Sequence, residues 1–160
     1  MSSESSGNMT PLAARPLFMM RLLVGPLQTI GGPAGAGRRV GGIPGGRFDG
    51  EKLRGVVLPG GADWQIERSD GAIELDARIV LQTDDDALIG MTYVGLRHGA
   101  PEVMARLGRG EAVAPSEYYF RIVARFSTSD PRYQWLNSII AVGIGHRLPE
   151  GPVYLVHEIA

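Results

Sequence analysis

Residues 73–96 read IELDARIVLQTDDDALIGMTYVGL, and this stretch decides the fold. Over its first ten positions apolar side chains occupy every second place, and charged or polar ones occupy most of the others. The apolar set is Ile73, Leu75, Ala77, Ile79 and Leu81, and the polar set is Glu74, Asp76, Arg78 and Gln82. Because successive side chains of a β-strand point to opposite faces, this alternation predicts a strand with one buried face. The acidic run at 84–86 then turns the chain into a second strand over 87–96, so the pair forms a β-hairpin.

The rest of the chain consists of similar short segments separated by turn residues. We expect further strands at 53–58, 64–68, 116–128, 138–146 and 153–159, and one more within the apolar run 16–27. Helix is scarce: 101–107 can form two turns, with proline first and Gly108 as the stop, and 130–137 can form one more. So many short strands indicate a sandwich or a barrel, and closure removes exposed sheet edges. We therefore predict an all-β fold, a closed antiparallel β-barrel of about eight to nine strands with one or two short helices.

The length and composition indicate one globular domain. At 160 residues, with 44% hydrophobic and 21% charged residues, the chain can bury a core of its own. We expect residues 1–12 to form a disordered tail and residues 13–160 to form the single barrel domain. Residues 31–46 contain eight glycines. We interpret that stretch as a loop or a series of turns, either a mobile flap or a turn-rich edge.

Composition also excludes several functions. The 16 basic and 17 acidic residues give a net charge of −1, which provides no electrostatic footprint for nucleic acid or an anionic membrane. No cysteine is present, so disulfides, zinc–thiolate sites and thiol nucleophiles are excluded. Arg21 interrupts the apolar run 16–27, which is too short to span a membrane, and we expect a cytoplasmic protein. His98, His146 and His157 show no metal-ligand spacing, and we predict neither a metal nor a cofactor.

The polar faces of two alternating strands are the main candidates for chemistry. They carry Glu74, Asp76 and Arg78 on one strand and Glu117, Tyr119 and Arg121 on the other. Alternation alone favours a surface position, where such charges form ordinary cross-strand pairs. Inside a barrel the same groups could perform acid–base chemistry, since burial raises a carboxyl pKa and a nearby arginine restores the charged form. Trp64 beside Asp63 could be a core residue or a ligand wall, and so could Trp135, while Asn137 could cap backbone groups.

Several strings in the sequence resemble those of a known bacterial family. They are GGRFDG at 45–50, LPGGADW at 58–64, LDAR at 75–78, PSEYYFR at 115–121 and YQWLN at 133–137, in the family's order. Over about 17–159 the chain resembles the bacterial domain-of-unknown-function family 3237, the UPF0311-like proteins. Asp86 departs from the glycine expected at its hairpin turn, and the glycine-rich stretch before Arg38 is longer than usual. The resemblance implies a calycin-like barrel and no particular function.

The resemblance also bears on the site. Its strings are rich in charged and aromatic residues, which fits a lined cavity better than a solvated face, so it favours the lumen. The candidate catalytic residues are Asp63, Glu117, Tyr119 and Arg121, and the candidate ligand-binding residues are Trp64, Asp76, Arg78, Trp135 and Asn137. Glu117 or Asp63 would act as acid or base, and Tyr119 would donate a proton. Arg78 or Arg121 would stabilise an enolate or a carboxylate.

Such a cavity fits two functional classes, and a third class needs no cavity. The first is a cofactor-free acid–base enzyme, of isomerase, cyclase or lyase type, that acts on a small oxygenated substrate. The second is a carrier or binding protein for a small apolar ligand. The third is a structural subunit whose charged strand faces organise a homo-oligomer. The expected partners are a small-molecule ligand and further copies of the chain, and the fold alone does not choose among these classes.

Overall fold

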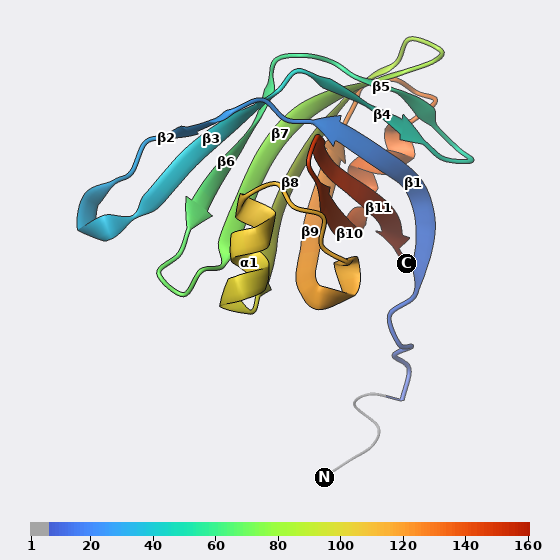
Figure 1. Ribbon diagram of the computed structural model, residues 1–160. Helices are drawn as coiled ribbons and strands as arrows, with labels where there is room; N and C mark the ends of the chain where they lie inside the picture. Colours follow the sequence, from blue (N-terminus) through green and yellow to red (C-terminus); the bar gives the residue numbers. More distant parts are fainter. Residues whose placement is uncertain (1–6) are drawn as a thin grey trace.

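The computed structural model describes residues 7–160, which fold mainly into strands. Along these residues it contains eleven strands, one α-helix and three 3₁₀ segments (Figure 1). The strands are β1 (Ala14–Leu23), β2 (Leu27–Thr29), β3 (Gly37–Ile43), β4 (Gly45–Asp49), β5 (Arg54–Val57), β6 (Gly61–Glu67), β7 (Ile73–Thr83), β8 (Leu88–Gly99), β9 (Tyr118–Ser127), β10 (Ile140–Leu148) and β11 (Gly151–Ile159). The helical segments are η2 (Pro33–Gly35), α1 (Pro101–Gly108), η3 (Pro115–Glu117) and η4 (Gln134–Ser138).

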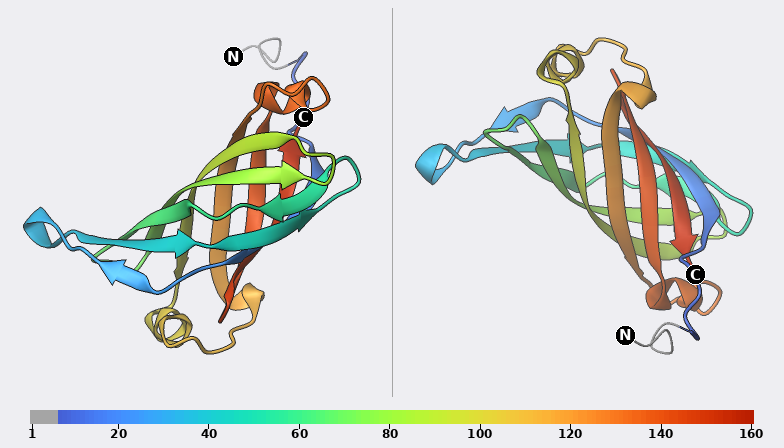
Figure 2. Two further views of the ribbon diagram at one scale, coloured as in Figure 1. Left: turned by 90° about the horizontal axis from the view of Figure 1, so that it is seen from above. Right: turned by 90° about the horizontal axis from the view of Figure 1, so that it is seen from below.

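Eight of these strands close into a ring. Hydrogen bonding runs in the order β7–β5–β4–β1–β11–β10–β9–β8, and the pairing of β8 with β7 completes the circle. The pairings within it are antiparallel. Strands β6, β3 and β2 continue the sheet beyond β7 and form an arm that projects from the barrel (Figure 2). The predicted closed antiparallel β-barrel is therefore confirmed, with eight strands in the ring.

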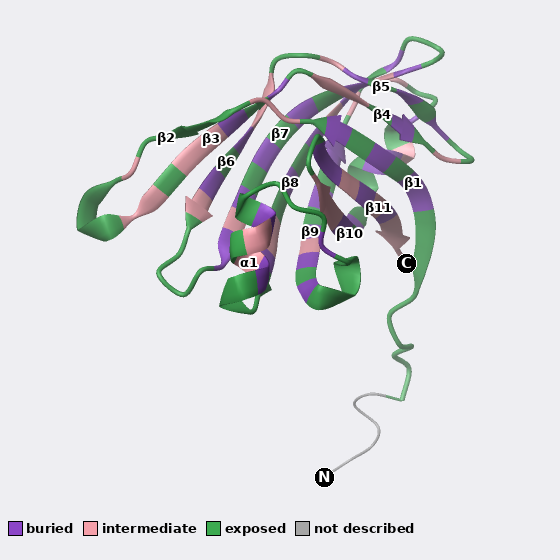
Figure 3. Cartoon of the chain, in the orientation of Figure 1, coloured by how far each residue is buried: buried purple, intermediate pink, exposed green. Residues whose placement is uncertain are grey.

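The long strand β7 joins the ring to the arm. Its residues 73–78 pair with β6, and its residues 81–83 pair with β5 along the same edge. On its other edge, residues 73–82 pair with β8, which is the hairpin that the alternating sequence predicts. The alternating apolar residues of β7 are buried inside the barrel, and the residues between them are mostly exposed (Figure 3).

Side chains fill most of the lumen. Towards one end, the Phe18 ring lies 5.5 Å from that of Phe48 and 6.1 Å from that of Phe126, centroid to centroid. Further along, the Tyr154 ring lies 5.4 Å from that of Tyr93 and 5.3 Å from that of Phe120. An eight-stranded barrel has an interior just wide enough for side chains to fill. Space for a ligand inside this barrel is therefore confined to its ends.

The glycine-rich segment 31–46 is more regular than predicted. Residues 37–43 form β3, which pairs with both β2 and β6. Two of its glycines lie where neighbouring backbones approach closely: a Cβ at Gly37 would collide with the Glu67 carbonyl, and one at Gly46 with that of Arg21. The interpretation of this whole segment as a loop was wrong, because these glycines permit close strand packing.

The two ends of the barrel differ. Segment η4 covers one end, where Leu136 is fully buried and the Tyr133 hydroxyl donates to the Asp85 carboxylate at 2.9 Å. Helix α1 lies at the opposite end and buries Val103 and Leu107 (Figure 2). Its proline is at the first turn, as the sequence predicts. The end under α1 is the one that holds a polar cavity.

Two further expectations concern the start of the chain and the membrane. Residues 7–12 of the predicted tail 1–12 are exposed and belong to no strand, and residues 1–6 lie outside the described residues. Within 7–160, the model contains no helix that is both long and apolar enough to cross a membrane.

The turn between β7 and β8 yields a stability prediction. Asp86 has a φ of 70°, in the left-handed region that glycine adopts without strain. We expect Asp86→Gly to raise the free energy of unfolding by about 0.5 kcal/mol, because relief of strain outweighs the added freedom of the unfolded chain. Urea denaturation would measure the change. Asp84→Gly is the matched control and should lower stability, so a loss in both variants would contradict this account.

Candidate functional site at the mouth of the barrel

A small polar cavity lies at the mouth of the barrel, partly covered by α1. Its volume is about 100 Å³. Its polar lining consists of Arg39 from β3, Asp63 and Gln65 from β6, Tyr93 and Arg97 from β8, Arg147 from β10 and Tyr154 from β11. Leu107 and Gly108 of α1 also line it. Closure of the sheet brings these side chains together from five strands that are far apart in the sequence.

Strand alternation explains why these polar groups point inward. On β6, successive side chains point to opposite faces, so Asp63 and Gln65 are buried and Trp64, between them, points outward. On β8, Tyr93 and Arg97 belong to the buried set. Every second residue of each strand points into the barrel. In the middle of the barrel these residues are apolar, and at the mouth they are polar.

A directional chain of hydrogen bonds holds the Asp63 carboxylate. Arg39 Nε donates to Gln65 Oε1 at 2.9 Å, and Gln65 Nε2 donates to Asp63 Oδ2 at 2.8 Å. The backbone N–H of Asp76 donates to the other carboxylate oxygen, Oδ1, at 3.2 Å. Because a guanidinium group can only donate, Arg39 fixes which end of the Gln65 amide faces Asp63. The carboxylate is thereby held in one orientation at the cavity wall.

The environment of Asp63 favours its protonated form. Burial raises the pKa of this carboxyl above its ordinary value of 3.8, and this effect outweighs the others. The hydrogen bonds from Gln65 and from the Asp76 N–H act in the opposite direction, as does the positive charge of Arg97. A carboxyl with a raised pKa and a fixed orientation is suited to exchanging protons with a bound molecule.

Arg97 brings an incompletely paired positive charge into the same cavity. Its side chain is only 7% exposed, and its Nε–H has no hydrogen-bond partner among the described residues. Burial, together with the nearby charges of Arg147 and Arg39, lowers its pKa to about 10, while Tyr154 and Asp63 act in the opposite direction. Arg97 therefore stays charged at neutral pH while one of its donors is unused.

Tyr154 provides a second unused donor. Its side chain is fully buried, and its hydroxyl lacks a hydrogen-bond partner in the part of the chain described. Burial raises its pKa above the ordinary range, and the Asp63 charge adds to this effect. The phenol therefore keeps its proton and can donate it in a hydrogen bond to a bound oxygen atom.

The mouth as a whole is positively charged. Among the residues described, its lining contains the guanidinium groups of Arg39, Arg97 and Arg147 and the single carboxyl group of Asp63. Arg147 is held at the rim, where its backbone N–H donates to the Tyr118 hydroxyl at 2.7 Å. Arg39 pairs with Glu67 at 3.2 Å and Arg147 is half-buried, so the buried, incompletely paired charge is that of Arg97. A buried cation with an unused donor favours an anion.

The structure places one of the predicted site residues, Asp63, in this cavity. Asp76, Arg78, Tyr119 and Trp64 are exposed on the outer face of the barrel, and Arg121 lies there half-buried. Our expectation that these side chains line the lumen was wrong. The apolar residues that alternate with them fill the narrow interior, because burying those residues is favourable and burying charges there is costly.

The remaining predicted residues also lie outside the mouth cavity. Glu117, at the end of η3, accepts a hydrogen bond from the Ala114 N–H at 3.1 Å and pairs with Arg106 at 3.5 Å. Asn137 exchanges two hydrogen bonds of 2.8 Å with the Thr128 backbone, which is the capping role that the sequence left open. Trp135 packs against the core from η4, with Lys52 Nζ 5.0 Å from its ring.

Sequence reasoning missed most of the mouth. The residues missed are Arg39, Gln65, Tyr93, Arg97, Arg147 and Tyr154. The sequence did contain an indication for two of them. Gln65 is two positions after Asp63, so both side chains point to the same face of the strand. Arg97 is an even number of positions from Met91 and Tyr93 and so shares their face, one residue beyond the predicted strand end. Nothing in the sequence indicated that β10 and β11 would meet these strands at one end.

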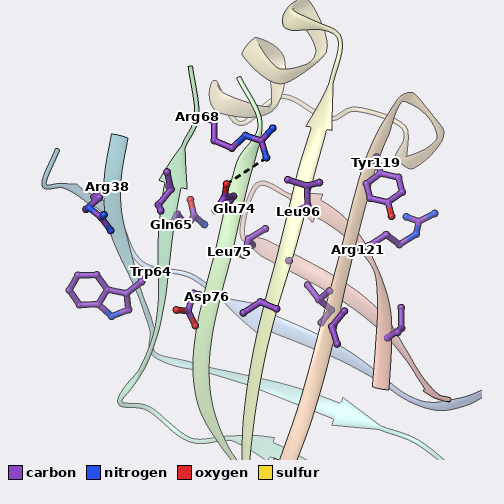
Figure 4. Close-up of a pocket in the computed structure, with 16 residues that line it drawn as sticks. Arg38, Trp64, Gln65, Arg68, Glu74, Leu75, Asp76, Leu96, Tyr119 and Arg121 are labelled. Carbon is purple, nitrogen blue, oxygen red and sulfur yellow. Dashed lines mark ion pairs between the residues drawn. The ribbon is translucent and has the colours of Figure 1, made fainter. Parts of the chain in front are cut away.

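The outer face carries a second, wider hollow, of about 770 Å³. We call it the outer groove. It lies across β6 to β10, with Trp64 and Arg38 on one side and Tyr119 and Arg121 on the other (Figure 4). Its floor includes Val94, Val123 and Val142. Four of the predicted site residues thus gather here: Trp64, Asp76, Tyr119 and Arg121.

Fold and site together define a class: a closed eight-stranded β-barrel with a buried acid and an incompletely paired arginine at one mouth. Within residues 7–160, no three histidine, aspartate or glutamate side chains gather as a metal site.

The chain belongs to the family described as "Protein of unknown function (DUF3237)", whose model matches residues 12–159. The family resemblance seen in the sequence is therefore confirmed. The chain is 41% identical to UPF0311 protein RPA1785 of Rhodopseudomonas palustris, over 94% of this chain and 99% of that protein.

Solved structures agree with the fold. The crystal structure of RPA1785, a conserved protein of unknown function, matches with a TM-score of 0.89 and 40% identity, covering 95% of this chain and all of that one (100%). A β-barrel-like protein of Acinetobacter baumannii AYE (ABAYE2633) matches with a TM-score of 0.84 and 38% identity, covering 96% and 99%. A structure described as an enzyme from Penicillium herquei, 24% identical with a TM-score of 0.72 and covering 96% and 98%, shares the fold alone.

The shifted pKa of Asp63 can be measured directly. Carboxyl ¹³C NMR should give Asp63 a midpoint above 3.8, because burial disfavours its charged form. Between pH 3.8 and the folded pKa, the folded protein keeps this proton and the unfolded chain has lost it. The free energy of unfolding that this group contributes therefore falls as the pH rises through that range. Asp70, whose pKa the Arg68 guanidinium lowers, is the internal control. A midpoint for Asp63 at or below 3.8 would contradict this description.

The buried charge of Arg97 predicts a variant that is more stable. We expect Arg97→Met to raise the free energy of unfolding by about 1–2 kcal/mol, because an apolar side chain of similar length replaces an incompletely paired buried charge. Denaturant titration would measure it. Arg121→Met, on the outer face, should change stability by no more than about 0.5 kcal/mol. Destabilisation by Arg97→Met would show that Arg97 is fully paired.

Proposed function

We propose that the mouth of the barrel binds a small oxygenated anion and that Asp63 exchanges a proton with it. The observation that carries this proposal is the Nε–H of Arg97, which is buried and has no partner in residues 7–160. A buried donor on a charged group is costly to leave unused. An anionic oxygen of the ligand would satisfy it with a charge-assisted hydrogen bond.

The other groups at the mouth narrow the ligand class. Tyr154 offers a hydroxyl donor that stays protonated, and the three guanidinium groups attract negative charge. A carboxylate or an enolate meets these requirements, since both are planar and accept hydrogen bonds. A small apolar ligand meets them less well, because it would leave the same donors unused.

A carbonyl compound with an acidic C–H would use Asp63, Arg97 and Tyr154 together. Asp63, as carboxylate, takes the proton from the carbon next to the carbonyl. The electron pair of that C–H bond forms the C=C bond of an enolate, and negative charge moves to the oxygen. Arg97 and Tyr154 stabilise that oxygen. Return of the proton from Asp63 to a different atom of the enolate gives an isomer, so the reaction consumes no other reagent.

Proton exchange in D₂O tests this role of Asp63 without knowledge of the natural substrate. The full-length protein is incubated with small 2-oxo acids, beginning with 2-oxobutyrate, and ¹H NMR follows loss of the hydrogens next to the carbonyl. We expect exchange faster than in buffer, and a loss of about 100-fold or more in Asp63→Asn. Asp84→Asn is the matched control, since Asp84 is exposed in the turn after β7 and does not line the mouth cavity, and it should keep the wild-type rate.

Binding is tested separately. The Arg97 Nε–H resonance should shift on titration with acetate, benzoate or 2-oxobutyrate, and should not shift with butanone, the neutral control. Absence of a shift with all three anions contradicts the anion site. Binding without proton exchange retains the anion site, contradicts the role given to Asp63, and leaves a binding protein as the function.

A further inference from the structure

We propose that the outer groove is the surface through which two copies of this chain associate as a symmetric dimer. The groove is separate from the mouth cavity, so this inference does not depend on the proposed function. Its apolar residues are exposed: Val94 and Val123 at its centre are 56% and 46% exposed, and Trp64 at its edge is 56% exposed. A contiguous apolar patch with a charged rim on a water-soluble surface marks an interaction site.

The strand register shows how regular this surface is. Trp64, Asp76, Val94, Val123 and Val142 are directly opposite one another on β6 to β10 and form one row across the sheet. The residues two positions away form a second row in the same way. That row consists of Ile66, Glu74, Leu96, Arg121 and Ile144.

The second row is complementary to its own copy. Glu74 and Arg121 are each one strand from Leu96, on opposite sides of it, and Ile66 and Ile144 are each two strands away. A two-fold axis along β8 therefore sets Glu74 of one copy against Arg121 of the other, and sets Ile66 against Ile144. Within one copy Glu74 already pairs with Arg68 at 3.5 Å (Figure 4), so Arg121 of the other copy would be the second partner of this carboxylate. An interface in which i contacts j and j contacts i is what a two-fold dimer requires.

The first row fits the same axis at its middle, where Val94 faces its own copy, and at its two ends, whereas Asp76 of one copy faces Val123 of the other with no ionic partner. Trp64 and Val142 are each two strands from Val94, so the axis places the Trp64 ring of one copy over Val142 of the other. Exposed aromatic residues are frequent anchors of protein interfaces. Charge complementarity and the position of Trp64 therefore favour a second copy of this chain as the occupant, in a face-to-face packing of two sheets.

Sedimentation velocity on the full-length protein tests the proposal. From about 1 to 100 µM, the wild type should sediment with twice the 17.2 kDa mass of the chain. Val123→Glu should weaken association by about 30-fold or more, because it buries a charge at the centre of the interface. Val80→Glu is the matched control. Val80 is 41% exposed on the outer face of β7 but lies outside the groove, so this variant should still dimerise.

Charge exchange tests the orientation of the two copies. Glu74→Arg and Arg121→Glu should each weaken the dimer, because each sets like charges opposite one another, and the double variant should restore it. Circular dichroism checks that every variant is folded. A wild type that is monomeric at 100 µM, or a dimer that folded Val123→Glu leaves intact, overturns the proposal. Failure of the double variant to restore association overturns the proposed axis.

Discussion

Closure of the sheet by the pairing of β7 with β8 is the constraint on which the rest of the structure depends. Once eight strands form a ring, every strand has one face towards a narrow lumen and one face towards the outside. The middle of that lumen admits apolar side chains, as the packed phenylalanine and tyrosine rings show. Charged side chains are therefore excluded from the middle and can enter only where the ring opens. The mouth under α1 is such a place.

The mouth accepts groups that the rest of the interior does not. Arg97 and Tyr154 are buried with unused donors, and Asp63 is buried with a raised pKa, and each of these features costs stability. A fold tolerates such costs where a ligand compensates for them. The rest of the barrel interior is apolar and well packed, and its burial offsets these unfavourable terms. Polar groups that are buried at the mouth, next to an apolar middle, differ in this way from polar groups exposed on the protein surface.

Strand β6 serves both surfaces. Asp63 and Gln65 face the mouth cavity, while Trp64, between them, faces the outer groove. The string LPGGADW, through which the chain resembles its family, therefore contributes one residue to each side of the sheet. A family string rich in charged and aromatic residues does not have to line one cavity, and the assumption that it does produced the wrong orientation for Asp76 and Arg121.

The sequence by itself determined most of the strands, the β7–β8 hairpin and the closed barrel, because alternation and turn chemistry are local properties that short stretches specify. It did not predict β3 and β4, which lie largely in the glycine-rich segment 31–46. It also determined which residues share a face, and so it separated Leu75 and Ala77 from Asp76. Only the tertiary structure decided which face is inside, because that depends on the burial of all eight strands at once. It also decided that Arg97, Tyr154 and Asp63 meet, since pairing between strands far apart in the chain sets which side chains reach the same end of a barrel. For the same reason, Gly37 and Gly46 were interpretable only once the strands that approach them were in place.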